Sequence, residues 1–136
     1  AQRFVLTDGD DHIRGTWGVD ESGMTRLQLR DHAGVARLRI SVLDNGSPGM
    51  AFTDEGGRSR VVLGLLPDRS SSLVFADPTG ATRAVLGISA DEGATLVFAD
   101  RSGETRAGLG VDKIGQPTFL MTEDPADSEA DAGGGR

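Results

Sequence analysis

The chain repeats itself with a period of 23 residues, and this period constrains the fold more than any other feature. The clearest copies are LVFADPTGATRAVLGISADEGAT and LVFADRSGETRAGLGVDKIGQPT, which follow each other directly. A fixed period of this length is typical of repeat architectures, in which each unit packs mainly against its neighbours. Five units occupy residues 4–26, 27–49, 50–72, 73–95 and 96–118, and a truncated sixth occupies 119–122.

Within each unit, apolar residues alternate with other residues in two short runs. In the fourth unit, Leu73 and Phe75 belong to the first run, and Leu86 and Ile88 belong to the second. Alternation with period two indicates half-buried strands. The segment DPTG between the runs suits a type I turn, after which Gly can adopt a positive φ. We therefore predict an all-β fold, a repetitive antiparallel β-hairpin array of about ten strands.

An Asp, a Gly and an Arg recur at fixed positions and form the signature of the repeat. We interpret the Asp as an acceptor of backbone N–H groups in the turn, and the Arg as its partner or as a cover over the sheet. A ladder of binding residues is the alternative, but a residue present in every unit is expected to serve the unit. The signature residues are Asp31, Gly34, Arg37, Asp54, Gly57, Arg60, Asp77, Gly80, Arg83, Asp100, Gly103 and Arg106.

Each hairpin has one strongly apolar face, which something must cover. Either the sheet winds into a two-layer β-solenoid, or identical chains cover one another as a trimeric β-prism or fibre. Trp17 and Leu86 share a column of this face and are expected to be buried. The other face is mixed, and it is least polar in units four and five. The candidate interface residues are Val74, Val85, Val97, Phe119, Leu120 and Met121.

Composition excludes several classes of protein. The formal net charge of −7 argues against a nucleic-acid partner, since phosphates require a basic surface. Without cysteine the chain has no disulfide scaffold and no thiol catalysis, and a structural zinc site is not expected. No run approaches the ~20 apolar residues of a transmembrane helix, so membrane contact would require a missing anchor or a partner. The first residue is Ala, which would fit removal of a signal or anchor.

We find no catalytic constellation. The repeated Asp residues fall at strand ends, and neither His12 nor His32 has a matched Ser nucleophile nearby, so we expect solvated turn histidines and no enzyme. Asp8, Asp10 and Asp11 resemble calcium ligands, but no EF-hand spacing follows them. We therefore expect neither a metal nor a cofactor.

The second unit has the most polar outer face. Its residues are Gln28, Arg30, Arg37, Arg39 and Ser41. An anionic partner is one interpretation of these residues, and a solvated face is the one we favour. Residues 123–136 are acidic and glycine-rich, and such a segment cannot bury enough apolar area to offset its ordering entropy. We expect it to be disordered alone or ordered only against another subunit.

The motif L-x-L-x-D-x-x-G-x-x-R-x-x-L-G-V resembles a repeat of poorly characterised bacterial cell-envelope β-hairpin proteins. In the fifth unit it is carried by Leu96, Phe98, Asp100, Gly103, Arg106, Leu109, Gly110 and Val111. Such proteins often bear an N-terminal membrane anchor. The resemblance implies an extracytoplasmic β-repeat module, in the periplasm or at the cell surface, and it implies no enzyme.

Together these observations favour a non-enzymatic structural or scaffolding module. We expect it to act by self-association, with a homotrimer favoured, or as an accessory subunit of a larger assembly. A carbohydrate- or surface-binding module is the alternative. One Trp, no Tyr and five Phe, most of them in apolar columns, make that alternative less favoured.

Overall fold

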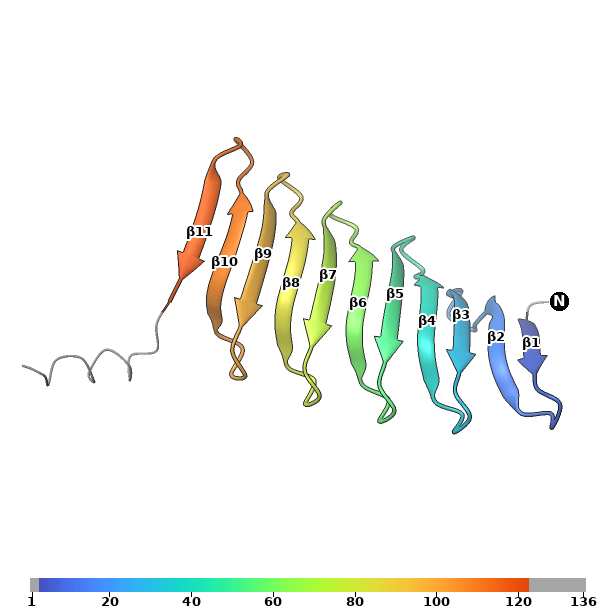
Figure 1. The fold of residues 1–136 in the computed structure, drawn as a ribbon. Coiled ribbons are helices and arrows are strands. Elements are labelled where there is room, and N and C mark those ends of the chain that lie inside the picture. Colours follow the sequence, from blue (N-terminus) through green and yellow to red (C-terminus); the bar gives the residue numbers. More distant parts are fainter. Residues whose placement is uncertain (1–2, 123–136) are drawn as a thin grey trace, which may run out of the picture.

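The computed structural model describes residues 3–122 as one antiparallel sheet whose eleven strands follow sequence order (Figure 1). The predicted all-β hairpin array is therefore confirmed, with one more strand than the ten expected because the truncated sixth unit adds β11. The strands are β1 (Arg3–Thr7), β2 (Ile13–Val19), β3 (Thr25–Arg30), β4 (Ala36–Val42), β5 (Pro48–Thr53), β6 (Ser59–Leu65), β7 (Ser71–Ala76), β8 (Thr82–Ile88), β9 (Ala94–Ala99), β10 (Thr105–Val111) and β11 (Pro117–Met121).

All ten chain reversals between these strands use the same turn. The carbonyl of its first residue accepts the N–H of the fourth, and the N–H of the first donates to the carbonyl of the fifth. In the turn that begins at Asp77, the two bonds are 2.9 Å each, from Gly80 to Asp77 and from Asp77 to Ala81. The fourth residue always has a positive φ, 92° at Gly80. A single turn geometry at every reversal fixes the register of every strand pair.

This register aligns one large apolar side chain from every strand in a single row across the whole sheet. Residues directly opposite each other in a ladder project to the same face. The row consists of Phe4, Trp17, Leu27, Ile40, Met50, Leu63, Leu73, Leu86, Leu96, Leu109 and Phe119, each paired with the next. We call this the central row.

Two further rows flank the central row on the same face. One consists of Leu6, Gly15, Leu29, Leu38, Phe52, Val61, Phe75, Ala84, Phe98, Ala107 and Met121. The other consists of Val19, Thr25, Val42, Pro48, Leu65, Ser71, Ile88, Ala94, Val111 and Pro117. None of these residues is charged, so we call the three rows the apolar face, and the other side the opposite face.

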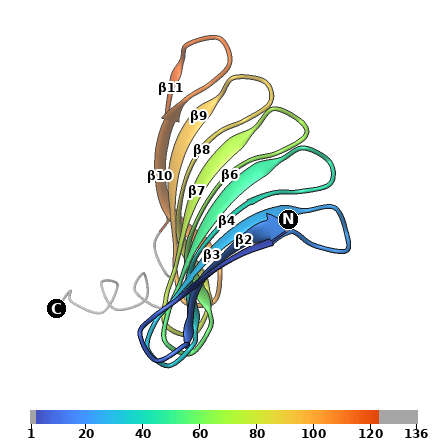
Figure 2. The ribbon, with the colours of Figure 1, turned by 90° about the vertical axis from the view of Figure 1, so that its right-hand side faces the viewer.

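The described chain has no core of its own. Ala36, 5% exposed, is the one hydrophobic residue that counts as buried among residues 3–122. Trp17 is 55% exposed and Leu86 is 50% exposed, so the expectation that they are buried is wrong for the single chain. The reason is visible in Figure 2, where the sheet is curved but remains one layer. Nothing within the described residues folds back over the apolar face as a solenoid would.

The three turns whose fourth residue is not glycine adopt the same backbone conformation. Asp11, Arg69 and Glu92 have φ values of 61°, 72° and 72°. The first unit, whose DGDD segment departs from the D-x-x-G pattern, therefore turns like the others. A residue with a Cβ atom is strained by about 1–2 kcal/mol when its φ is positive.

We predict that Gly80→Ala destabilises the protein by about 1–2 kcal/mol. A Cβ added at Gly80 meets no atom within 4 Å, so the loss would come from the backbone conformation alone. Gly56→Ala is the matched control, because Gly56 lies in a turn of the same kind without a positive φ. Thermal unfolding of both variants measures the difference, and equal melting temperatures would contradict the turn assignment.

Candidate functional site

The most regular polar feature is a row of Asp–Arg pairs along one long edge of the sheet. The five Arg residues are the extra residues of five β-bulges. In β7 and β8, for example, Phe75 pairs with Ala84 and Ala76 pairs with Thr82, which leaves Arg83 without a ladder partner. The bulge residues are Arg14, Arg37, Arg60, Arg83 and Arg106.

Each Asp of the row organises its own turn. In the fourth unit, Asp77 Oδ1 accepts the N–H groups of Thr79 and Ala81 at 2.9 and 3.2 Å, and it also accepts the Thr79 hydroxyl at 2.6 Å. Its other oxygen, Oδ2, lies 3.5 Å from Nη1 of Arg83. The carboxylate is therefore bound on both sides by groups of its own hairpin.

Four of the five Arg residues also reach the next hairpin along the chain, Arg14 through Nη1 to the Asp31 carbonyl and the other three through Nε. Nε of Arg83 donates to the Ala99 carbonyl at 2.8 Å, and Nε of Arg60 donates to the Ala76 carbonyl at 2.8 Å. Nε of Arg37 donates in the same way to the Thr53 carbonyl at 2.7 Å. These guanidinium groups therefore join the Asp of one unit to the backbone of the next. We call this arrangement the Asp–Arg clamp.

The hydrogen bonds of the clamp lower the pKa of its carboxyl groups, which makes them poorly suited to acid–base catalysis. The hydrogen bond from the Thr79 hydroxyl, with the two backbone N–H donors and Arg83, lowers the pKa of Asp77 from 3.8 to about 2. The hydroxyl of Ser102 and the guanidinium of Arg106 hold the pKa of Asp100 still lower. A carboxylate that is ionised at neutral pH and tightly hydrogen-bonded is a poor general acid and a weak general base. The row supports the fold.

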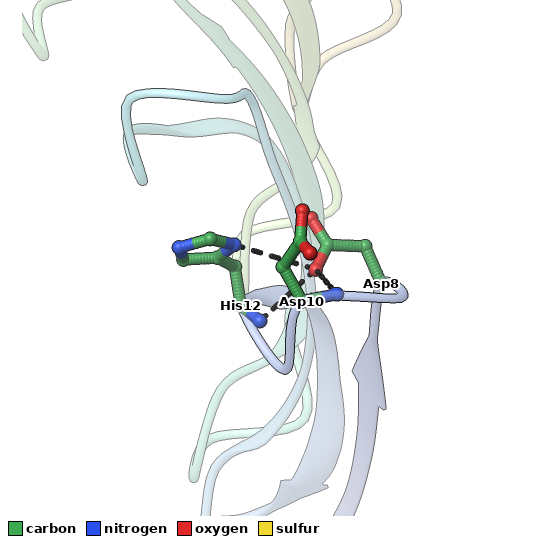
Figure 3. A group of neighbouring side chains, drawn as sticks. All are labelled: Asp8, Asp10 and His12. Carbon is green, nitrogen blue, oxygen red and sulfur yellow. Dashed lines mark hydrogen bonds and ion pairs between the residues drawn. The ribbon is translucent and has the colours of Figure 1, made fainter.

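A second candidate is the group formed by Asp8, Asp10 and His12, whose potential ligand atoms lie within 4.8 Å of one another (Figure 3). Asp8 is already engaged, because Oδ1 accepts the N–H groups of Asp10 and His12 at 3.0 Å each. Its Oδ2 lies 2.6 Å from Nη2 of Arg14, a cation that would repel a metal ion. The same backbone contacts occur in the turns that begin at Asp31, Asp54, Asp77 and Asp100, so we assign this group to the clamp of the first unit.

The two histidines differ in their surroundings. The His12 side chain is 67% exposed, and its Nδ1 lies 3.4 Å from Asp8 Oδ1. His32 is not simply a solvated turn residue, because its Nδ1 lies 2.8 Å from Nη2 of Arg14. Since Arg14 can only donate, His32 accepts this bond. His32 therefore helps to hold the bulge arginine of the first unit.

The structure places the candidate interface residues on both faces. Val74, Val85 and Val97 are consecutive members of one row on the opposite face, and Leu120 ends that row at β11. Phe119 and Met121 belong to the apolar face, where Phe119 is 73% exposed. The six residues therefore form two surfaces.

The arginines of the second unit have different surroundings. Arg39 lies in the row of Gln28 on the opposite face, whereas Arg37 is a bulge residue whose guanidinium is held by the clamp. Arg30 donates to the Gly34 carbonyl at 2.8 Å and to Gln28 Oε1 at 3.0 Å.

Comparison with protein-family models gives no match, and comparison with curated proteins gives none either. Within residues 3–122, no helix has the length and apolar character needed to cross a membrane.

We predict that Arg83→Met lowers the free energy of unfolding by about 1–2 kcal/mol, because the Ala99 carbonyl and Asp77 both lose a donor. Arg101→Met is the matched control, since Arg101 is exposed and has no hydrogen bond or ion pair within the described residues. Urea unfolding measures both variants. Similar midpoints for the two would show that the clamp contributes nothing.

The lowered pKa of Asp77 predicts a pH dependence with a defined sign. A carboxyl whose folded pKa of about 2 lies below its ordinary 3.8 stabilises the fold fully above that ordinary value. This stability is lost as the pH falls from about 4 through 2. Asp77→Asn should therefore be less stable than the parent at pH 7, and the difference should shrink towards pH 2. Urea midpoints between pH 2 and 7 test this, with Asp44→Asn as control. A constant difference would refute it.

Proposed function

We propose that this chain is a non-enzymatic structural module that acts as a homotrimer, with the apolar faces of three copies packed around a common axis. The observation that supports this proposal most is the apolar face, which runs over all eleven strands without a charged residue and is uncovered within residues 3–122. Soluble proteins rarely expose contiguous apolar patches above a few hundred Å² unless another molecule covers them.

The size of the apolar face supports self-association. Three rows about 7 Å apart, across eleven strands about 4.8 Å apart, cover roughly 50 by 17 Å, or about 900 Å² in projection. A typical stable interface needs about 800 Å² from each partner. Leu86, Leu63 and Phe75 are each about half exposed, at 50%, 47% and 44%. Burying such a side chain completely would contribute about 1 kcal/mol more.

The short strands favour three copies around one axis. Strands of five to seven residues are about 17–24 Å long. In a triangle with sides of about 20 Å, the centre lies about 6 Å from each side, close to half the ~10 Å spacing of packed sheets. The central row, which is large and apolar at every strand, would then fill the axis. The flanking row with Gly15, Ala84 and Ala107 also contains Phe52, Phe75 and Phe98, and this mixture of small and large residues would lie nearer the corners.

The cellular setting of the proposal rests on the repeat motif. Its resemblance to cell-envelope repeats supports an extracytoplasmic location, in the periplasm or at the cell surface. There the trimer would serve as a spacer or scaffold. The Val74, Val85 and Val97 surface, which faces outwards in this trimer, would allow it to dock as an accessory subunit onto a larger assembly.

The proposal predicts a large effect of a charge on the apolar face. Leu86→Glu would place three carboxylates near the axis, so the mass in solution should fall from 3 × 14.2 = 42.6 kDa towards that of one chain. Ser72→Glu is the matched control, because Ser72 lies on the opposite face of the same strand pair. Light scattering coupled to gel filtration measures both. A parent of 14.2 kDa, or equal masses for the two variants, would count against the trimer.

A further inference from the structure

The arginines of the strands have an uneven distribution. None of the eleven strands contains Asp or Glu. Apart from the five bulge residues, all their arginines lie on the opposite face of β1, β3 and β4. These four are Arg3, Arg26, Arg30 and Arg39. A cluster of cations confined to one end of one face, in a chain of net charge −7, needs a specific explanation.

Three of these arginines, Arg3, Arg30 and Arg39, have no acidic partner in the described residues, and Arg30 bonds only the Gly34 carbonyl and Gln28. Arg39 and Arg3 form no hydrogen bond or ion pair within residues 3–122, and Arg26 is 3.8 Å from Asp20, too far for a hydrogen bond. Arg39 lies in the same row as Gln28. Arg3 and Arg26 share the neighbouring row, in which they are two strands apart. Side-chain donors therefore extend over three strand spacings, from β1 to β4, or about 14 Å across the strands.

Two hollows on this face meet at the cluster. One, of about 370 Å³, lies between Arg3 and Arg26 and is also lined by Asp20 and Glu21. The other, of about 560 Å³, extends from Arg26 and Arg39 to β6 and has no acidic residue in its lining. Arg26 and Gln28 line both, so the hollows form one trough across the strands. Its floor is low at Gly49 and Gly64, which have no side chain. Val62 adds an apolar wall.

The charges around the trough restrict what can lie in it. Both long edges of the sheet consist of turns with acidic residues, Asp31 and Asp54 on one side and Asp20 and Asp44 on the other. A broad anionic surface, such as a bilayer or a DNA duplex, would meet these acids as well as the arginines. A single polymer strand about 10 Å wide would lie between the edges and meet Arg26 and Arg39 in the larger hollow, with Asp20 and Glu21 beside it only at the β1–β3 end.

The lining of the trough further narrows the class of polymer. All aromatic residues of the strands belong to the apolar face, so the trough has none on which bases could stack, as single-stranded nucleic acids require. Arg26 and Arg39 offer forked donors for carboxylate or sulfate groups. Gln28 and Ser41 offer partners for hydroxyl groups, and Val62 offers an apolar contact for the C–H side of a sugar ring.

The acidic segment 123–136 of the chain itself is a poor occupant. It begins after β11, and seven strand spacings of about 4.8 Å, or about 34 Å, separate β11 from β4. Its last acidic residue, Asp131, follows Thr122 by nine residues, which span at most about 31 Å when extended. Charge complementarity with an external polymer is therefore the better match.

We propose that this trough, called here the arginine trough, binds a linear acidic polysaccharide across β1–β6. The site lies on the face that the trimer leaves outside, so the assembly and the polymer would occupy separate surfaces. The proposal goes beyond the structural role of the trimer and does not depend on its stoichiometry. The arginine trough would attach the module to an anionic sugar matrix.

The experiment uses the full chain and oligogalacturonate of about ten units as the probe, titrated by calorimetry at low and moderate salt. Neutral dextran of equal length, a DNA duplex and vesicles with an anionic lipid are the other arms. Arg26→Gln with Arg39→Gln removes two trough arginines. Arg101→Gln with Lys113→Gln removes the same charge from exposed turns and is the matched control.

We expect the parent to bind oligogalacturonate but not dextran, and the trough variant to bind about tenfold or more weakly with a shallower salt dependence. The control variant should stay within about twofold of the parent. Absent binding, equal losses in both variants, or equal or tighter binding of DNA or vesicles would overturn the proposal.

A second measurement needs no variant. In hydrogen exchange of the parent with and without oligogalacturonate, added protection should concentrate in β3 to β5, beside the arginine trough. Protection in the β9–β11 half of the sheet, or none anywhere, would contradict the assignment. Because gel filtration follows the trimer independently, loss of polymer binding with an unchanged mass would leave the proposed assembly intact.

Discussion

The four-residue turn that recurs at every reversal is the constraint on which the rest of the structure depends. Because each turn has the same hydrogen bonds and a positive φ at its fourth residue, no strand can slip by one residue. Such a slip would exchange the two faces and break the central row. Because ten turns fix the register of ten strand pairs, the apolar residues that alternate along each strand all lie on one side of the sheet. Together they form the uncharged apolar face.

The turn and the apolar pattern demand registers that differ by one residue, and the bulge reconciles them. The turn pairs Asp77 with Ala81 and Ala76 with Thr82, whereas the apolar face requires Phe75 opposite Ala84. The residue left over is Arg83, and its position in the bulge lets it bind both its own Asp and the next hairpin. The most regular column of charged residues is thus a consequence of joining a turn to a sheet.

The hairpins, their turns and the apolar face could be predicted from the sequence, because local periodicity and turn chemistry determine them. The bulges could also have been predicted from the sequence. The register that the turn residues impose differs by one residue from the register that the apolar residues impose, and this difference requires a bulge. The exposure of Trp17 and Leu86 could not be predicted, because periodicity shows which face is apolar without showing what covers it. The arginine trough required the pairing of β3 with β4 and the low floor at Gly49 and Gly64, both of which depend on register.

Trp17 allows the most direct test of whether copies of this chain cover the apolar face. It is the one tryptophan of the chain, lies in the central row beside Phe4, and is 55% exposed when the chain is alone. If the apolar faces pack together, Trp17 fluorescence in the purified protein should be blue-shifted and shielded from acrylamide, and dilution to dissociation should reverse both. A folded protein whose Trp17 emits and is quenched like a solvent-exposed indole at every concentration would contradict this account.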